Sequence, residues 1–248
     1  IDHFKKINNK ELYKYYKKIF SEFKIDVIVM GEIDEEEVTK EIDNLLHNFK
    51  SKNSYYKDLY LKVNKKSNIK NEKIENTQSN LLVGLTFDKL TENERDYKLV
   101  IYNTRLGCMN NSVLFVNVRE KNSLCYHIGS TINRFTDTIQ IDSGINKKNY
   151  EKTINLINSS LEDMKNEKVI DKLIVNAKKT LEISYNDFYD NSRKIIDYYY
   201  LNEFVKIPSI EDRRKMLSEI SSKDIVDIAK KVKVNTIYLL EGSINEED

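Results

Sequence analysis

The first fifty residues alternate apolar and polar positions in a way that predicts a helix, a strand and a second helix. Apolar side chains recur every three or four positions from Asn8 to about Phe20, and Asn8 with Glu11 resembles a capping box. Residues 25–31 (IDVIVMG) are rich in β-branched side chains and are predicted to form a buried strand. A second capped helix is expected to begin at Asp34.

The rest of the chain predicts a longer unit of mixed helices and strands. Strands are predicted at 78–88, 124–133, 137–145 and 234–240, with the middle two joined as a hairpin. Helices are predicted at 92–107, 111–121 and 147–165, from about 168 to a point before Pro208, and from Ser221. Residues 51–72 are polar and rich in lysine, which indicates a linker with room for one strand. The pattern is that of an α+β protein.

Two short segments near opposite ends of the chain echo each other. Residues 7–12 read INNKEL and residues 220–225 read ISSKDI, about 210 positions further on. Each copy continues into a predicted helix, a predicted strand and a glycine, Gly31 or Gly242. Such a distance is too long for a solenoid repeat. It fits either a duplicated domain or the chance recurrence of a common capped-helix pattern.

The charge balance, the lengths of the apolar runs and the cysteine content of the chain disfavour several classes of protein. The 248 residues carry 41 basic and 40 acidic side chains, and this balance gives no electrostatic case for nucleic acid or an anionic membrane. No apolar run approaches the 18 residues of a membrane span, and no signal peptide is visible, although the chain opens with Ile. Two cysteines without a disulfide-rich pattern favour a reducing, cytoplasmic setting.

The motifs of several enzyme classes are missing from the sequence. Its three histidines form neither H-E-x-x-H nor H-x-x-E-H, so the two imidazoles that such zinc sites need on one helical face are lacking. His127 stands two positions after Cys125, but a metal needs three or four converging ligands. There is no phosphate-binding glycine loop and no G-x-S-x-G. We therefore assign no catalytic and no metal-binding residue in this chain.

One pair of residues stands out as a candidate binding site. Arg119 lies near the end of a predicted helix and Tyr126 near the start of the next predicted strand, so the intervening turn can bring both to one surface. A guanidinium and a phenol together can hold a peptide carbonyl or carboxylate. From spacing alone, a solvated arginine and a core tyrosine are the favoured explanation of the pair.

The same stretch resembles the second half of the insulinase, pitrilysin and mitochondrial-processing-peptidase family. The residues that carry the resemblance are LFVNVREKNSLCY at 114–126, DSGI at 142–145, Gln78, and the segment INNKEL to GEIDEEEV at 7–38. The likeness covers nearly the whole chain and is greatest to bacterial cytoplasmic members that are encoded as pairs with one zinc-deficient partner. It implies three parts, namely 1–50 as the tail of a first homologous half, 51–72 as a linker, and 73–248 as a zinc-free second half.

The resemblance also implies a fold and a role. The fold would be a two-layer, mixed and largely antiparallel sheet packed on helices, a half-domain of the LuxS and processing-peptidase type. Zinc would belong only to an active half or partner subunit, and Arg119 and Tyr126 would bind the peptide substrate. The leading hypothesis is thus a non-catalytic, substrate-binding half that is inactive by itself. The alternative is an inactive scaffold or assembly subunit of the same fold.

Overall fold

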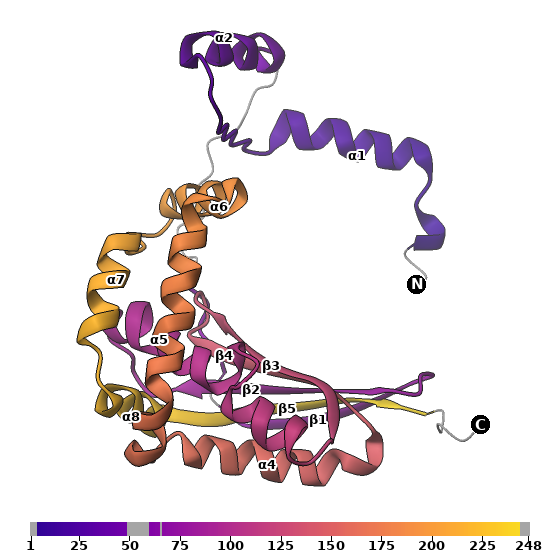
Figure 1. Cartoon of the computed structure of the whole chain (residues 1–248). Coiled ribbons are helices and arrows are strands. Elements are labelled where there is room, and N and C mark those ends of the chain that lie inside the picture. Colours follow the sequence, from indigo (N-terminus) through magenta and orange to yellow (C-terminus); the bar gives the residue numbers. More distant parts are fainter. Residues whose placement is uncertain (1–3, 49–59, 65, 244–248) are drawn as a thin grey trace. The chain divides into compact units, whose positions relative to one another are not determined.

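The computed structural model describes residues 4–48, 60–64 and 66–243, and its order of elements is shown in Figure 1. The strands are β1 (Asn68–Ile74), β2 (Ser79–Phe87), β3 (Cys125–Asn133), β4 (Thr138–Ile145) and β5 (Val232–Gly242). The α-helices are α1 (Asn9–Glu22), α2 (Glu35–Leu46), α3 (Leu99–Asn103), α4 (Tyr150–Asp163), α5 (Glu167–Tyr189), α6 (Ser192–Asn202), α7 (Ile210–Glu219) and α8 (Ser222–Lys231). Short 3-10 turns are η1 (Phe4–Lys6) and η5 (Lys147–Asn149), and π-helical turns are η2 (Glu94–Lys98), η3 (Thr104–Cys108) and η4 (Phe115–Glu120).

The chain divides into two compact units. The larger holds Tyr60–Asp190 and Lys206–Asp248, and the smaller holds Ile1–Leu59 and Asn191–Val205. This division reflects compactness, whereas the boundaries implied by the resemblance concern descent from two homologous halves, so those boundaries stay a prediction.

One five-stranded sheet organises the larger unit, in the order β1-β5-β2-β4-β3. β1 runs parallel to β5, and the other neighbours are antiparallel. In β2, Leu81, Val83 and Leu85 are buried, whereas Leu82 and Gly84 between them are half-buried, so the strand has one core face. The predicted α+β fold with a largely antiparallel sheet packed on helices is confirmed.

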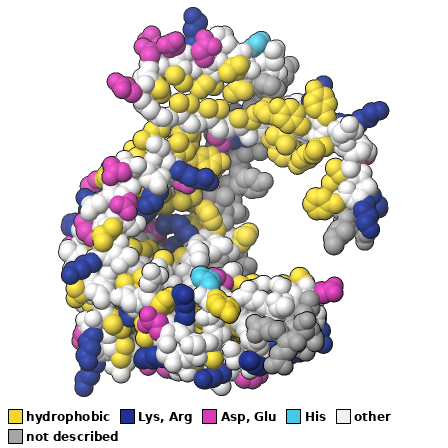
Figure 2. All heavy atoms as spheres, turned by 45° about the vertical axis from the view of Figure 1, so that its right-hand side comes forward, with side chains coloured by type: hydrophobic (Ala, Val, Ile, Leu, Met, Phe, Trp, Pro, Cys, Tyr) yellow, Lys and Arg dark blue, Asp and Glu magenta, His cyan; other side chains and the backbone are white. Residues whose placement is uncertain are grey.

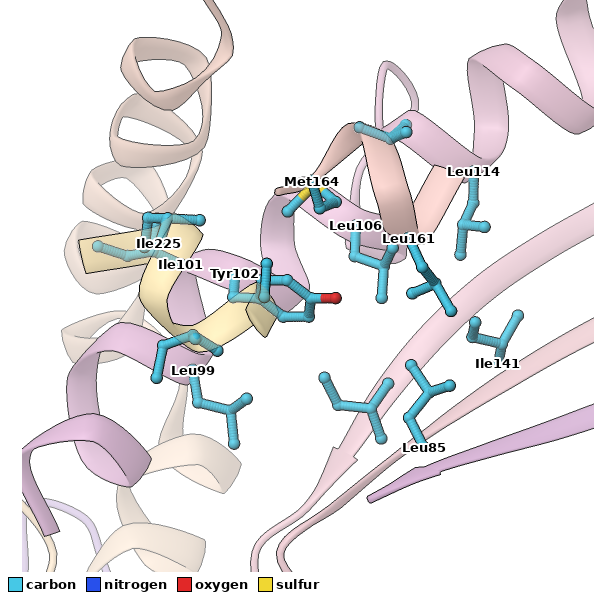
Figure 3. Packing of buried hydrophobic residues seen from close by; sticks show 14 of the residues in the cluster. Leu85, Leu99, Ile101, Tyr102, Leu106, Leu114, Ile141, Leu161, Met164 and Ile225 are labelled. Carbon is cyan, nitrogen blue, oxygen red and sulfur yellow. The ribbon is translucent and has the colours of Figure 1, made fainter. Parts of the chain in front are cut away.

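The core lies between that sheet face and the helices of the larger unit. Figure 3 shows Leu85 and Ile141 of the sheet near side chains from the helical layer, among them Leu161 of α4 and Leu106 of η3. All of these residues are less than a tenth exposed. Fully burying one such side chain stabilises the fold by roughly 1.5–3 kcal/mol, so this cluster holds the sheet and the helical layer together.

The smaller unit contains well-capped helices with little buried surface. The Asn8 side chain accepts a hydrogen bond from the Glu11 amide at 3.0 Å, and Asp34 accepts one from Glu37 at 2.9 Å, as the sequence predicted. Neither α1 nor α2 has a buried residue. Figure 2 shows hydrophobic side chains gathered on the surface of this part of the chain, and Leu12 is 61% exposed.

The structure corrects the predicted buried strand at 25–31. These residues form no strand, and Val27, Val29 and Met30 are each exposed by more than two-fifths. A strand needs a neighbour to pair with its backbone N–H and C=O groups. No described strand pairs with this segment, so its β-branched composition alone does not make it a strand.

Three further differences concern boundaries. The helix predicted to run from about 168 towards Pro208 ends at Tyr189, because Asn191 caps a new helix by accepting from the Lys194 amide. α7 was not predicted, although Ser209 caps it in the same way. The strand allowed for in the 51–72 linker is β1, which begins within that segment and extends two residues beyond it.

In the described part of the chain, no helix is both long enough and apolar enough to cross a membrane.

Candidate functional site

A pocket of about 870 Å³ opens at one end of the sheet in the larger unit. Its wall comes from the end of η4, the start of β3, the end of β4 with the turn that follows, and the residues just before β2. Arg119 and Tyr126 both line it. The volume is within the range of about 300–1,000 Å³ that is usual for ligand sites. The structure therefore brings the two predicted residues to one surface.

Arg119 is held above an aromatic ring at the end of a π-helical turn. Its guanidinium carbon lies 4.8 Å from the centre of the Phe115 ring, one turn earlier in η4. Stacking on a ring occupies the face of the guanidinium and leaves its N–H edge available. In the described structure that edge has neither an ion-pair nor a hydrogen-bond partner, so the donors of Arg119 are free for a ligand.

The turn between η4 and β3 is tightly fixed. Ser123 has a φ of 50°, in the left-handed region that non-glycine residues seldom adopt. Its amide donates to the Arg119 carbonyl at 2.8 Å, and the Leu124 amide donates to the Val118 carbonyl at 3.2 Å. The Asn122 side chain donates to the carbonyl of Asn117 at 2.8 Å. These bonds set the position of Arg119 relative to the first residues of β3.

Tyr126 occupies a β-bulge. Cys125 pairs with Ile145 and His127 with Gly144, so Tyr126 is an extra residue without a partner in β4. A bulge interrupts the alternation of side chains between the two faces of a sheet and redirects one of them. Tyr126 is 81% exposed, which excludes the core tyrosine that the sequence left open. Its hydroxyl has no hydrogen-bond partner among the described residues.

The floor of the pocket is apolar and the wall beside it is closely packed. Leu124 and Ile145 are buried at 6% and 2% exposure and line the floor. A Cβ added to Gly144 would lie 2.3 Å from Nε2 of Gln78, so the absence of a side chain at this glycine leaves the space that the Gln78 amide occupies. An amide, a guanidinium and a phenol thus surround an apolar base, an arrangement suited to peptide groups.

Two other titratable side chains at the start of β3, Cys125 and His127, have interaction partners of their own. Burial raises the pKa of the Cys125 thiol, and a hydrogen bond with Ser143 and the charge of Arg119 oppose that rise. His127 lies beside the pocket, and its Nε2 is 2.7 Å from Oδ2 of Asp142. No group of three His, Cys, Asp or Glu side chains within the described residues could hold a metal ion. The pocket therefore offers a ligand the hydrogen-bond donors of Arg119 and Tyr126.

Sequence reasoning missed some of the residues that line the pocket. Phe115 and Lys148 line it without having been predicted as site residues, and Gln78 had been noted only for its likeness to a family motif. Lys148 follows the end of β4, and the pairing of β4 with β3 brings it to the same pocket as Tyr126. No local pattern signals such a contact, because it depends on the register of two strands.

Comparison with known proteins gives consistent matches. The profile of a family described as the peptidase M16 inactive domain matches residues 6–181. A Bacillus subtilis (strain 168) protein described as probable inactive metalloprotease YmfF is 27% identical over 248 residues, covering 98% of this chain and 57% of that protein. The structure of a conserved protein from Enterococcus faecalis V583 is 25% identical, with a TM-score of 0.82 over 96% of this chain and 56% of that one.

More distant structures share the fold. A protease from Helicobacter pylori matches 97% of this chain and 60% of its own with a TM-score of 0.71 at 15% identity. Pitrilysin matches 97% of this chain and 27% of its own with a TM-score of 0.65 at 13% identity. The present chain spans a little over half the length of its Bacillus and Enterococcus relatives.

Proposed function

The chain belongs to the family of peptidase M16 inactive domains, and we propose that its Arg119–Tyr126 pocket holds a segment of peptide without cleaving it. The observation that carries this proposal is the convergence of an unpaired guanidinium and an unpaired phenol on one pocket among the described residues. Both groups donate hydrogen bonds, and a peptide in extended form presents carbonyl acceptors at regular intervals.

The geometry favours positioning over bond cleavage. Stacking on Phe115 holds the guanidinium of Arg119, so less of its side-chain entropy is lost when a peptide binds, and the turn at Ser123 sets the backbone that leads to Tyr126. Holding a peptide in a defined place can lower the barrier of a reaction that another group performs. We assign that group, and any zinc, to a homologous half or partner subunit. A cytoplasmic location, expected from two free cysteines, is part of the same proposal.

The smaller unit supports the proposal of a partner half. Its segment after α1 echoes in sequence the segment after α8, and the latter forms β5 between two other strands. The earlier copy has the same order of capped helix and β-branched segment, yet residues 25–31 are unpaired in the described structure and expose Val27 and Val29. We infer that this segment pairs as a strand with the sheet of a homologous half.

Peptide binding to the purified chain tests the pocket directly. Fluorescence anisotropy with short unstructured labelled peptides should show that replacing Arg119→Gln and Tyr126→Phe together weakens binding by about tenfold or more. Both side chains are exposed, so the double variant should unfold at the same temperature as the parent. The matched control is Tyr199→Phe, which removes a hydroxyl from a tyrosine that is 60% exposed and lies outside the pocket. Equal affinity of parent and double variant would contradict the proposal.

The unpaired segment keeps a second candidate function open, that of a scaffold which assembles with a partner half but binds no peptide. The two functions separate by experiment. Hydrogen exchange should show the amides of residues 25–31 becoming protected when a separately expressed homologous half is added. A scaffold would show this protection without any effect of Arg119 or Tyr126 on peptide binding. A segment that exchanges equally fast with and without the added half would refute the proposed strand pairing.

A further inference from the structure

We propose that the pocket selects peptide segments that carry a carboxylate, and that Lys148 is the residue that determines this preference together with Arg119. This inference rests on the proposed function, because it specifies the chemistry of the peptide that the same pocket would bind. It goes beyond the Arg119–Tyr126 pair by adding a second cation to the pocket lining, in the turn after the end of β4.

Hydrogen bonds hold the turn that carries Lys148 at the rim of the pocket. The side chain of Asn146 caps this turn by accepting from the Lys148 amide at 3.1 Å. The Asn149 side chain donates to the carbonyl of Leu124 at 3.4 Å, two residues before Tyr126. The backbone on either side of Lys148 is thus tied both to itself and to the start of β3, and its ammonium extends from a fixed base.

The charge of Lys148 is unpaired, whereas that of its neighbour is neutralised. Nζ of Lys147 lies 2.6 Å from Oε1 of Glu241, whose side chain is only 8% exposed. The Lys148 ammonium has no ion-pair or hydrogen-bond partner among the described residues, and neither has the Arg119 guanidinium. Within the described lining of the pocket, Glu120 is the single acid against these two bases, so the lining keeps one excess positive charge.

Because Lys147 is ion-paired and Lys148 is not, the charge of Lys148 affects which ligands the pocket can bind. An occupant covers part of the pocket and removes water from both unpaired cations, which costs free energy unless the occupant supplies a compensating charge. A carbonyl can accept from Arg119 but cannot neutralise two cations. A carboxylate can accept from either cation and also offsets the excess positive charge of the lining. That carboxylate can come from an acidic side chain or from a free peptide C-terminus.

Matched peptides distinguish these sources in a binding experiment on the full chain. One pair differs by Glu against Gln at an internal position, with both ends blocked. A second pair contains no acid and differs by a free against an amidated C-terminus. At low salt, the carboxylate member of at least one pair should bind about three- to tenfold more tightly than its neutral counterpart, since exposed and partly buried ion pairs have this strength. Added salt should reduce the difference.

The substitution Lys148→Gln should abolish most of that preference, because it weakens the binding of the carboxylate peptides far more than that of the neutral ones. The matched control is Lys152→Gln, which removes the same charge from an exposed position on α4 that does not line the pocket. Carboxylate and neutral peptides that bind equally, or a preference that survives Lys148→Gln, would overturn this inference and leave the proposed function standing. Failure of every peptide to bind would overturn both.

Discussion

Asp224 connects α8 to the neighbouring helical layer, and its replacement by Asn should destabilise the larger unit. Its carboxylate accepts from the amide and the hydroxyl of Ser221 at 2.9 and 2.6 Å, which completes a capping box at the start of α8. The other oxygen of the carboxylate lies 2.6 Å from Nζ of Lys98, far away in the sequence. Asp224→Asn keeps the shape but removes the charge that both partners contact.

The shifted pKa of Asp224 gives the magnitude. Burial alone would raise this pKa, but the hydrogen bonds from Lys98 and Ser221 outweigh burial and lower it from 3.8 to about 2. At roughly 1.36 kcal/mol per pKa unit, the ionised side chain contributes at most about 2.5 kcal/mol. Because 30% of the side chain is exposed, solvent screening reduces this contribution to about 1–2 kcal/mol.

The sign of the pH dependence follows from the lowered pKa. A carboxyl group whose pKa is lower in the folded state stabilises that state fully above pH 3.8, and the stabilisation is lost as the pH falls towards 2. Urea unfolding at neutral pH should therefore show a loss of about 1–2 kcal/mol for Asp224→Asn. The difference between variant and parent should shrink as the pH is lowered from 4 towards 2.

Asp227→Asn is the matched control on the same helix. Asp227 is about half exposed, and its contact with Lys230, three residues later, is 3.3 Å long. Such an exposed pair contributes roughly 0–1 kcal/mol, so this variant should unfold close to the parent. If Asp224→Asn cost no more than Asp227→Asn at neutral pH, or if its cost did not change with pH, the assigned role of Asp224 would be wrong.

Three further predictions address other parts of the larger unit. Arg105 is 4% exposed, and within the described structure the one hydrogen-bond partner of its guanidinium is a methionine sulfur at 3.9 Å. Arg105→Met should therefore raise the unfolding temperature by a few degrees in calorimetry, and a lowered unfolding temperature would contradict this. Cys108 is exposed whereas burial raises the pKa of Cys125, so mass spectrometry should find that iodoacetamide alkylates Cys108 first and that Cys125 reacts faster as the pH rises; equal rates would refute this order. Gly144→Ala should displace the Gln78 side chain and weaken peptide binding several-fold with little change in stability, because the clash is with the end of a flexible side chain; unchanged affinity would exclude Gln78 from the site.

Local signals in the sequence were sufficient for much of the fold. The start of α8 was predicted at Ser221, where the structure has a capping box with Asp224, and the hairpin of β3 and β4 was predicted from two strand patterns separated by a short turn. Each of these features depends on residues within a few positions of one another, which sequence patterns record. The order of strands, in which β5 lies between β1 and β2, depends on pairs of residues that are 145 to 168 positions apart, and such distant contacts leave no local pattern.

The candidate site shows the same limit at smaller scale. Arg119 and Tyr126 could be proposed from their spacing and from the family resemblance, since only a short turn separates them. The bulge that takes Tyr126 out of the alternation of side chains along β3 could not be predicted, because it arises from the register between β3 and β4. Lys148 was missed for the same reason, and its significance rests on Lys147 being neutralised by Glu241 from the far end of the chain.

The two similar segments, at 7–31 and 220–242, show which structural features depend on nearby residues alone and which require a pairing partner. Both helices form with their predicted caps, at Asn8 and at Ser221, because a cap needs only nearby residues. The segments after them differ in outcome, since β5 has a strand on each side whereas residues 25–31 have none among the described strands. A β-branched segment with exposed apolar side chains after a well-formed helix has the composition of a strand but lacks the neighbouring strand that would pair with its backbone. The proposal for the pocket rests on a similar observation, since Arg119 and Lys148 are cations without an ion-pair partner among the described residues.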